Sequence, residues 1–288
     1  MLVVTGMHRS GTTFVGKILD ACQELAVLHE PFNRHFGVAG ISKNYPDLDN
    51  GYELYAIEIL TRLAKLKKLK FVTECQNDTA LKALLRKTVG GKSEIQWRMI
   101  RMKSVFRERR LVLKDPFLSM ATQTLSAELN YKVVYLCRHP VAVWSSIQQM
   151  NWHMDLRNFF GHDYPVTGAE SEIEKFCQVW SVLNNHNMSI THPNYLFVTH
   201  EALCLAPEKE FERIFSHLGV PFSEQARARL NDMSTGDTAE KKGNKLHEFK
   251  RNSAAIINAW QRNVPQHEQE YILTHSQVQP LVSKLYEA

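Results

Sequence analysis

The stretch Val3-Val4-Thr5-Gly6-Met7-His8-Arg9-Ser10-Gly11-Thr12-Thr13-Phe14 stands almost at the start of the chain and decides its fold. Its first residues are apolar and mostly β-branched, as in a buried parallel strand. Gly6 and Gly11 bracket a four-residue loop, and the apolar-periodic segment that follows predicts a helix. A loop above a helix N-terminus directs several backbone N–H groups to one point, so the stretch predicts an anion site.

The spacing of the two glycines resembles a Walker A loop, G-x-x-x-x-G-K-[ST], but Thr12 stands where the lysine belongs. An ATPase or kinase would therefore lack the residue that reaches the β- and γ-phosphates. Arg9 instead places a planar fork of donors inside the loop, which suits a phosphate or a sulfonate. The alternative is a strand-turn-helix with incidental glycines, which the internal arginine and the Ser/Thr run disfavour.

At these residues the chain resembles the sulfotransferases that use 3′-phosphoadenosine 5′-phosphosulfate (PAPS). Their first signature reads approximately G-x-x-[RK]-S-G-T-[TS]-[FWL], and Gly6 to Phe14 matches it. Their second is a strand, R-[DHN]-P and a helix, with a serine eight residues after the arginine. Arg138-His139-Pro140 and Ser146 have this spacing.

The resemblance implies that Arg138 and Ser146 bind the 3′-phosphate of the nucleotide. It implies that the first loop holds the phosphosulfate end, through His8, Arg9, Ser10, Gly11, Thr12 and Thr13. The Lys-rich segment from Ser234 to Asn252 takes the place of the family's C-terminal nucleotide loop without matching it well. Arg251 is the contact expected from it.

Charged residues follow two further predicted strands, at Glu30 and at Lys114. The carboxyl ends of parallel strands face the ligand crevice of an open α/β sheet. The resemblance implies that Lys114 approaches the transferring sulfonate and that Glu30 is the base for the acceptor proton, with His153 and Asp115 as alternatives. Arg9 and Lys114 would stabilise the charge that develops on the leaving phosphate oxygen.

Strands alternating with helices predict an α/β, three-layer, P-loop-like fold with a central parallel sheet flanked by helices. We expect one domain over residues 1–288. Residues 36–108 form a mainly helical insertion that covers the site and, with residues 150–170, shapes acceptor binding. Strands are predicted at 2–4, 25–28, 111–113, 131–137 and 195–198. Helices are predicted at 12–22, 52–70, 79–87, 95–107, 118–130, from 140, and at 170–190, 206–218, 224–232, 254–261 and 266–286.

Composition bounds the class of protein. The chain has 288 residues, 44% of them hydrophobic, which is ample for such a domain, and no apolar run approaches the length of a membrane span. The first strand starts almost at Met1, which leaves no room for a signal peptide. The five cysteines are widely spaced without a C-x-x-C pair, which predicts reduced thiols. We therefore expect a cytoplasmic protein.

Positive charge is unevenly distributed. The net charge is +5, and residues 61–114 hold sixteen Lys/Arg against four Asp/Glu. Such a stretch can bind an anionic ligand or a nucleic acid, or it can form the solvated faces of helices. Solvated faces are favoured, and the absence of a stacking motif makes a nucleic-acid partner unexpected.

The expected function is transfer of a sulfonate from the cosubstrate PAPS to a hydroxyl or an amine of a glycan or small-molecule acceptor, releasing adenosine 3′,5′-bisphosphate. No metal is required. The alternatives are a P-loop kinase or NTPase and a non-catalytic nucleotide-binding protein on the same fold. The identity of the acceptor and the formation of a homodimer are left open.

Overall fold

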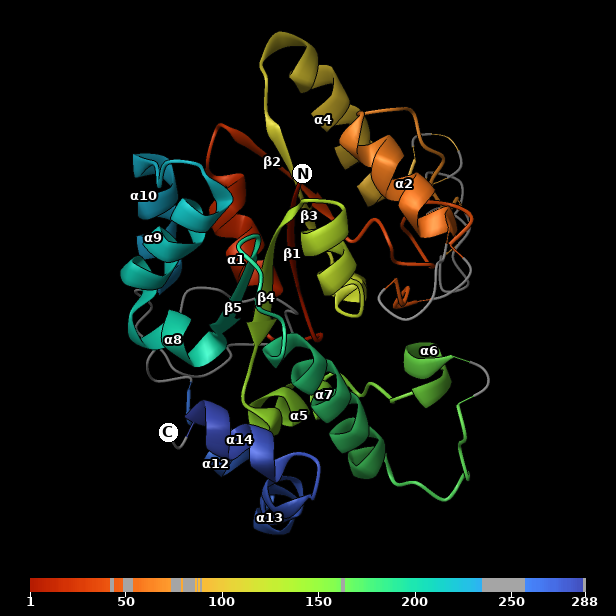
Figure 1. The fold of residues 1–288 in the computed structure, drawn as a ribbon, viewed down its shortest axis with the longest axis vertical. Coiled ribbons are helices and arrows are strands. Elements are labelled where there is room, and N and C mark those ends of the chain that lie inside the picture. Colours follow the sequence, from red (N-terminus) through yellow and green to blue (C-terminus); the bar gives the residue numbers. More distant parts are fainter. Residues whose placement is uncertain are drawn as a thin grey trace.

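Five parallel strands form one sheet in the computed structural model, in the order β2-β3-β1-β4-β5 (Figure 1). The structure describes residues 1–41, 44–48, 54–73, 79, 86, 88, 90–161, 164–234 and 257–286. The strands are β1 (Leu2–Gly6), β2 (Leu25–His29), β3 (Arg110–Lys114), β4 (Lys132–Cys137) and β5 (Tyr195–Thr199). The predicted α/β fold with a central parallel sheet flanked by helices is confirmed.

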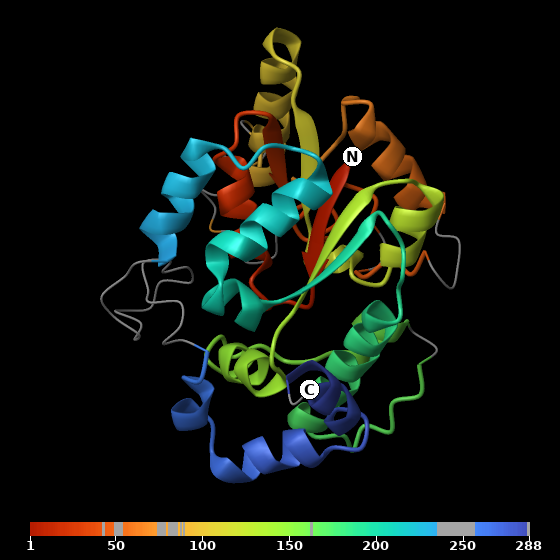
Figure 2. The same cartoon turned by 60° about the vertical axis from the view of Figure 1, so that its left-hand side comes forward.

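Helices cover both faces of this sheet. One face carries α1 (Thr12–Asp20), α8 (His200–Leu205), α9 (Pro207–Leu218) and α10 (Glu224–Ser234). The other face carries α2 (Leu54–Ala64), α4 (Lys92–Phe106), α5 (Pro140–Gln148) and α7 (Glu172–Met188). The helices α6 (Leu156–Phe160), α12 (Trp260–Asn263), α13 (Gln266–Thr274) and α14 (Gln279–Tyr286) pack against α5 and α7, and the last three, in blue, lie at the bottom of Figure 2.

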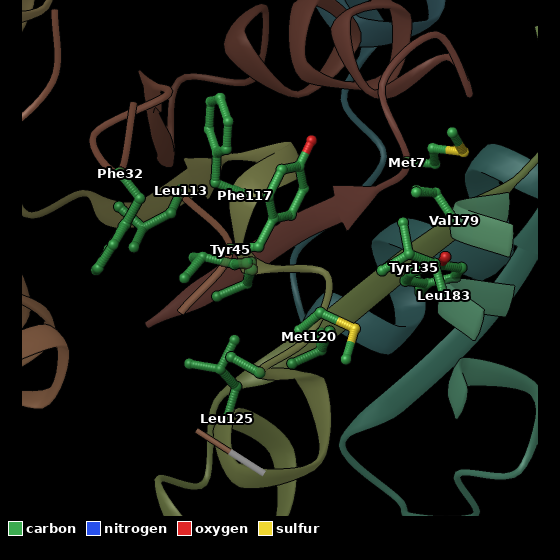
Figure 3. Close-up of a cluster of buried hydrophobic side chains, with 14 of the residues drawn as sticks. Met7, Phe32, Tyr45, Leu113, Phe117, Met120, Leu125, Tyr135, Val179 and Leu183 are labelled. Carbon is green, nitrogen blue, oxygen red and sulfur yellow. The ribbon is translucent and has the colours of Figure 1, made fainter. Parts of the chain in front are cut away.

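The alternation of side chains along each strand builds two cores. In β1, Leu2 and Val4 point to the layer of α1 and α9, whereas Val3 points to the layer of α5 and α7. All three are fully buried, as expected of a parallel sheet covered on both faces. The core on the side of α5 and α7 also holds Phe117 and Tyr45, whose ring centroids are 5.1 Å apart (Figure 3).

The predicted helix at 118–130 is wrong. A 3₁₀ turn (Pro116–Leu118) and a π-helical turn (Thr124–Glu128) occupy that segment instead. Asp115 caps the first turn by accepting the N–H of Phe117 (3.0 Å). In the second, the hydroxyl of Ser126 donates to the carbonyl of Thr122 (2.8 Å), a local bond that competes with regular helix geometry.

Two other differences have local causes. The expected helix at 266–286 breaks into α13 and α14, because His275 is extended and Pro280 suits the first turn of a new helix. The segment 150–167, for which the sequence predicted no helix or strand, contains α6, whose N-terminus is capped by the carboxylate of Asp155. Most of the predicted helix at 79–87 and nearly all of the 234–252 segment lie outside the described residues.

The expected insertion lies between β2 and β3, which are neighbours in the sheet. The described part of it contains α2 and α4 and one antiparallel bridge between Val38 and Phe71. Its role in acceptor binding stays a prediction. Within the described part of the chain, no helix combines the length and apolar character that a membrane crossing requires.

Candidate functional site

The topology marks one place where a ligand fits. β1 is central, with β3 on one side and β4 on the other, so the direction of chain progression across the sheet reverses there. In open α/β sheets the crevice at the carboxyl end of such a switch point binds ligands. The Met7–Gly11 loop leaves β1 at this point and leads directly into α1.

The backbone of this loop adopts conformations that few residues tolerate. A Cβ on Gly6 would lie 2.2 Å from the carbonyl oxygen of Leu136, so only glycine fits beside β4. Arg9 has φ 73°, a left-handed conformation that is strained for a residue with a side chain. The first N–H groups of α1, at Thr12 and Thr13, have no acceptor within the helix and, with the helix dipole, favour an anion.

The two motifs found in the sequence are in direct contact. Nε of Arg9 donates to Oγ of Ser146 on α5 at 2.8 Å, although the two residues are 137 positions apart. Arg138, between β4 and α5, donates from its guanidinium to the carbonyl oxygen of Arg9 at 3.0 Å. Its own carbonyl accepts the indole N–H of Trp180 at 3.0 Å. The structure therefore gathers two guanidinium groups and a hydroxyl at one end of the sheet.

Buried groups fix the backbone around Arg138. A carboxylate oxygen of Glu201 accepts the N–H of His139 at 3.0 Å, and the His139 ring stacks on Trp260 at 4.5 Å. Burial raises the pKa of Glu201 and lowers that of His139 to about 4. These contacts give Glu201 a structural role.

Glu30 and Lys114 form an ion pair at the ends of β2 and β3. Nζ of Lys114 donates to Oε1 of Glu30 at 2.6 Å. The side chain of Lys114 is 3% exposed and that of Glu30 is 26% exposed. Burial works to raise the pKa of Glu30, but the charge and hydrogen bond of Lys114 prevail and hold it below its usual value. Glu30 has φ 50°, so a second candidate residue sits on strained backbone.

Gly16 in α1 leaves room for the side chain of Lys114. A Cβ on Gly16 would lie 3.1 Å from Cγ of Lys114, so a larger residue there would push the lysine stem aside. Sequence reasoning missed Gly16, because a glycine inside a helix gives no sign of the strand side chain that crosses it.

The two alternative bases occupy different positions. Asp115 is fully buried, and its two oxygens accept the backbone N–H groups of Phe32 (2.7 Å) and Phe117 (3.0 Å). Burial raises the pKa of Asp115 to about 7. This carboxyl ties the loops after β2 and β3 together. His153 lies at a pocket rim, with 76% of its side chain exposed and Nδ1 3.6 Å from a carboxylate oxygen of Glu172.

A pocket of about 520 Å³ opens where these groups meet. Five aromatic side chains line it: Phe36, Tyr45, Phe117, Trp152 and Phe159. Its polar lining includes the predicted site residues Arg9, Thr12, Thr13, Glu30 and Lys114, together with Asn33, His35, Asn44 and Asp155. One pocket therefore brings together residues of the anion loop, the Glu30–Lys114 pair and a set of aromatic side chains.

His8 and Tyr45 connect the loop to the aromatic lining of the pocket. The Tyr45 hydroxyl lies 2.6 Å from Nδ1 of His8, and burial lowers the pKa of His8 to about 4, so the imidazole is neutral. Tyr45 also stacks on Phe159 at 4.2 Å, and Trp152 lies 5.9 Å from the guanidinium of Arg9. The sequence did not predict Tyr45 as a site residue, because it stands in a Gly/Asn/Asp/Pro-rich segment without hydrophobic periodicity.

The structure brings together ten of the eleven sequence-predicted site residues at the carboxyl edge of the sheet. They are His8, Arg9, Ser10, Gly11, Thr12, Thr13, Glu30, Lys114, Arg138 and Ser146. Arg251 lies outside the described residues. The chemical roles assigned to these residues stay predictions.

Comparison with known proteins gives a family match. A family model described as "Sulfotransferase family" matches residues 2–224. No curated protein matches the chain significantly.

Three similar solved structures are distant from this chain in sequence. The sulfotransferase domain from the curacin biosynthetic pathway is 17% identical, with 99% of this chain and 96% of that chain covered and a TM-score of 0.47. The sulfotransferase domain from the Synechococcus PCC 7002 olefin synthase is 18% identical, with coverages of 94% and 92% and a TM-score of 0.48. Retinol dehydratase in a complex with retinol and PAP is 13% identical, with coverages of 98% and 80% and a TM-score of 0.48.

Proposed function

The chain belongs to the sulfotransferase family and is a PAPS-dependent sulfotransferase, and from this premise we propose that its acceptor is a small molecule with a hydroxyl on an apolar body. The observation that carries the proposal is the position of the Glu30–Lys114 pair. Both residues line the same pocket as Arg9, Thr12 and Thr13 of the anion loop, which suits the phosphosulfate, and as aromatic side chains, which suit the acceptor.

The donor site divides between the two motifs. The loop N–H groups, Arg9 and the hydroxyls of Thr12 and Thr13 bind the phosphosulfate end. Arg138 and Ser146 bind the 3′-phosphate, for which a guanidinium and a hydroxyl are suitable donors. Because Arg138 also donates to the carbonyl of Arg9, the two halves of the donor site support each other.

The reaction is an in-line displacement at sulfur. The acceptor oxygen forms a new S–O bond, the S–O bond to the 5′-phosphate breaks, and adenosine 3′,5′-bisphosphate leaves with the bonding electrons. Glu30 takes the acceptor proton. Arg9 and Lys114 stabilise the charge that develops on the leaving phosphate oxygen. A bound sulfonate competes with Glu30 for the Lys114 ammonium, which frees the carboxylate to act as a base.

The lining of the pocket sets the class of acceptor. Five aromatic side chains line the pocket, and its accessible lining is more apolar than polar, although Asn33, His35, Asn44 and Asp155 also contribute. Ligand sites of this kind bury an apolar body and fix its orientation with a few polar groups. A glycan would need hydrogen-bond partners along its whole length, so an aromatic or alicyclic alcohol fits this pocket better.

The donor assignment predicts selective thermal stabilisation. Adenosine 3′,5′-bisphosphate at about a hundred times its Kd should stabilise the fold by about 2.7 kcal/mol. Mg²⁺-ATP at the same concentration should give a much smaller shift, because it lacks the 3′-phosphate and the loop lacks a Walker lysine. Thermal melts with each ligand measure this difference. Equal or greater stabilisation by Mg²⁺-ATP would favour a kinase or NTPase.

The acceptor assignment predicts the effect of Phe159→Ala. Removing this ring opens the wall against which Tyr45 stacks, so KM for a naphthol or sterol acceptor should rise about tenfold while KM for PAPS stays unchanged. Transfer of radiolabelled sulfonate measures both constants. The matched control is Phe160→Ala, since Phe160 packs on Tyr164 and is not a wall residue. Faster transfer to oligosaccharides than to any apolar alcohol would contradict the assignment.

A further inference from the structure

Helix α4 carries apolar side chains on two opposite faces. Its inner face buries Trp97 and Ile100, and the amide of Gln96 pairs with the edge strand β2 at the carbonyl of Val27 (2.7 Å) and the N–H of His29 (3.0 Å). Of the ten large hydrophobic side chains exposed among the described residues, five lie on the outer surface of this one helix. They are Ile95 (38%), Met99 (45%), Met102 (59%), Val105 (80%) and Phe106 (86%).

Four of these residues form a continuous stripe. Ile95, Met99, Met102 and Phe106 follow each other at intervals of four, three and four residues, so they share one side of the helix over roughly 16 Å. This is the spacing of a coiled-coil seam, a narrow line of apolar residues that packs against a second helix. We call these four residues the α4 stripe.

Cationic residues border the stripe. Arg98 and Lys103 take the positions on its two sides, where a coiled-coil helix carries the charges that select its partner. The whole helix holds Lys92, Arg98, Arg101 and Lys103 against a single carboxylate, Glu94. Four of the sixteen Lys/Arg of residues 61–114 therefore lie on the helix that carries this exposed apolar line. Solvation of a charged helix face accounts for the cations but not for the apolar line.

We propose that the α4 stripe docks an acidic amphipathic helix of a partner protein. Such a helix would bury its own apolar residues on Met99, Met102 and Phe106 and place its carboxylates opposite Arg98 and Lys103. The two methionines suit this contact, because their flexible side chains adapt to a partner surface.

Two other occupants fit the helix less well. A second copy of this chain would bring the same cations face to face, which opposes pairing of two α4 helices. An interfacial membrane helix has a broad apolar face, whereas the α4 stripe is one residue wide at each turn. None of the stripe residues lines the acceptor pocket, and α4 lies far from α6, which carries Phe159 (Figure 1). A partner on α4 thus leaves the pocket open.

A designed peptide tests the surface directly, because it carries only the chemistry that the α4 stripe should recognise. The probe is a blocked, fluorescent peptide of about four heptads with Leu at a and d and Glu at e and g. We expect wild-type protein to bind it saturably at low ionic strength and about tenfold more weakly in 0.5 M salt, since the salt screens the flanking charges. The same peptide with Lys in place of Glu should not bind.

Substitutions locate the contact. The double variant Met102→Glu/Phe106→Glu should bind the peptide at least tenfold more weakly than wild type. The single variant Lys103→Glu should also bind it more weakly. The control is Leu205→Glu, which adds one carboxylate at an exposed apolar position on α8 (71% exposed) and should bind the peptide like wild type. All three should keep sulfonate transfer, because none of these residues lies in the pocket or the donor loop. If the double variant does not fold, peptide binding by Lys103→Glu tests the proposal.

Three results would overturn the proposal. The first is a lack of saturable binding of the acidic peptide by wild-type protein, or binding that the α4 variants leave unchanged. The second is binding to phosphatidylglycerol vesicles, lost in the double variant, without peptide binding, which would assign the stripe to a membrane surface. The third is a wild-type dimer that the double variant converts to a monomer in sedimentation velocity. These readouts do not depend on the acceptor or on the sulfonate transfer.

Discussion

Replacing Glu30 with Gln should lower kcat about 10² to 10⁴-fold, the range that a positioned general base contributes. The amide oxygen of Gln can still accept from Nζ of Lys114, so the geometry of the pair is kept while the proton acceptor is lost. Binding of adenosine 3′,5′-bisphosphate should stay close to wild type. Single-turnover transfer and calorimetric titration with the bisphosphate measure the two effects separately.

The pH profile gives an independent check on the same residue. A base acts only when it is ionised, and Lys114 holds the pKa of Glu30 below its usual value. The value of kcat/KM, which reports the free enzyme with the Glu30–Lys114 pair intact, should therefore persist as the pH falls and decline only below the ordinary range of a glutamate. His153→Ala is the matched control for the alternative base, and it should change kcat little because His153 is largely exposed. Near-normal turnover by Glu30→Gln, or a large loss in His153→Ala, would transfer the role to another group.

The sequence predicted features whose cause is local. The Gly6–Phe14 loop was predicted because a strand, two glycines and a helix start follow one another within a few residues. The fold class and the family follow from such local patterns, and both predictions are confirmed. The strand ends at Glu30 and Lys114 were predicted for the same reason, since a proline follows each of them closely.

The sequence could not predict features that depend on packing across the sheet. The pairing of Glu30 with Lys114 requires β2 and β3 to be neighbours in register, and His29 pairs with Lys114 only in the folded sheet. The contact between Arg9 and Ser146 spans 137 positions. The break of residues 118–130 into two short turns depends on side-chain bonds of Asp115 and Ser126, which outweigh a helical pattern of apolar residues.

Replacing Arg138 with Ala should weaken binding of adenosine 3′,5′-bisphosphate about a hundredfold, as truncation of one partner in a buried charged pair does. Two effects contribute to this loss. One is the missing contact to the 3′-phosphate. The other is the missing hydrogen bond to the carbonyl of Arg9, which supports the strained loop. Only the first effect depends on the 3′-phosphate, so a second ligand can separate them.

Adenosine 5′-phosphosulfate lacks the 3′-phosphate and supplies that second ligand. If Arg138 binds the 3′-phosphate, Arg138→Ala should weaken binding of the bisphosphate far more than binding of the phosphosulfate. Ser146→Ala should also weaken binding of the bisphosphate more than that of the phosphosulfate, with a smaller loss of affinity. Arg138→Lys keeps the charge but not the fork of donors, so it should fall between wild type and Arg138→Ala. Equal losses for both ligands would mean that Arg138 acts only through Arg9. The second motif would then support the loop, and the 3′-phosphate would need another cation.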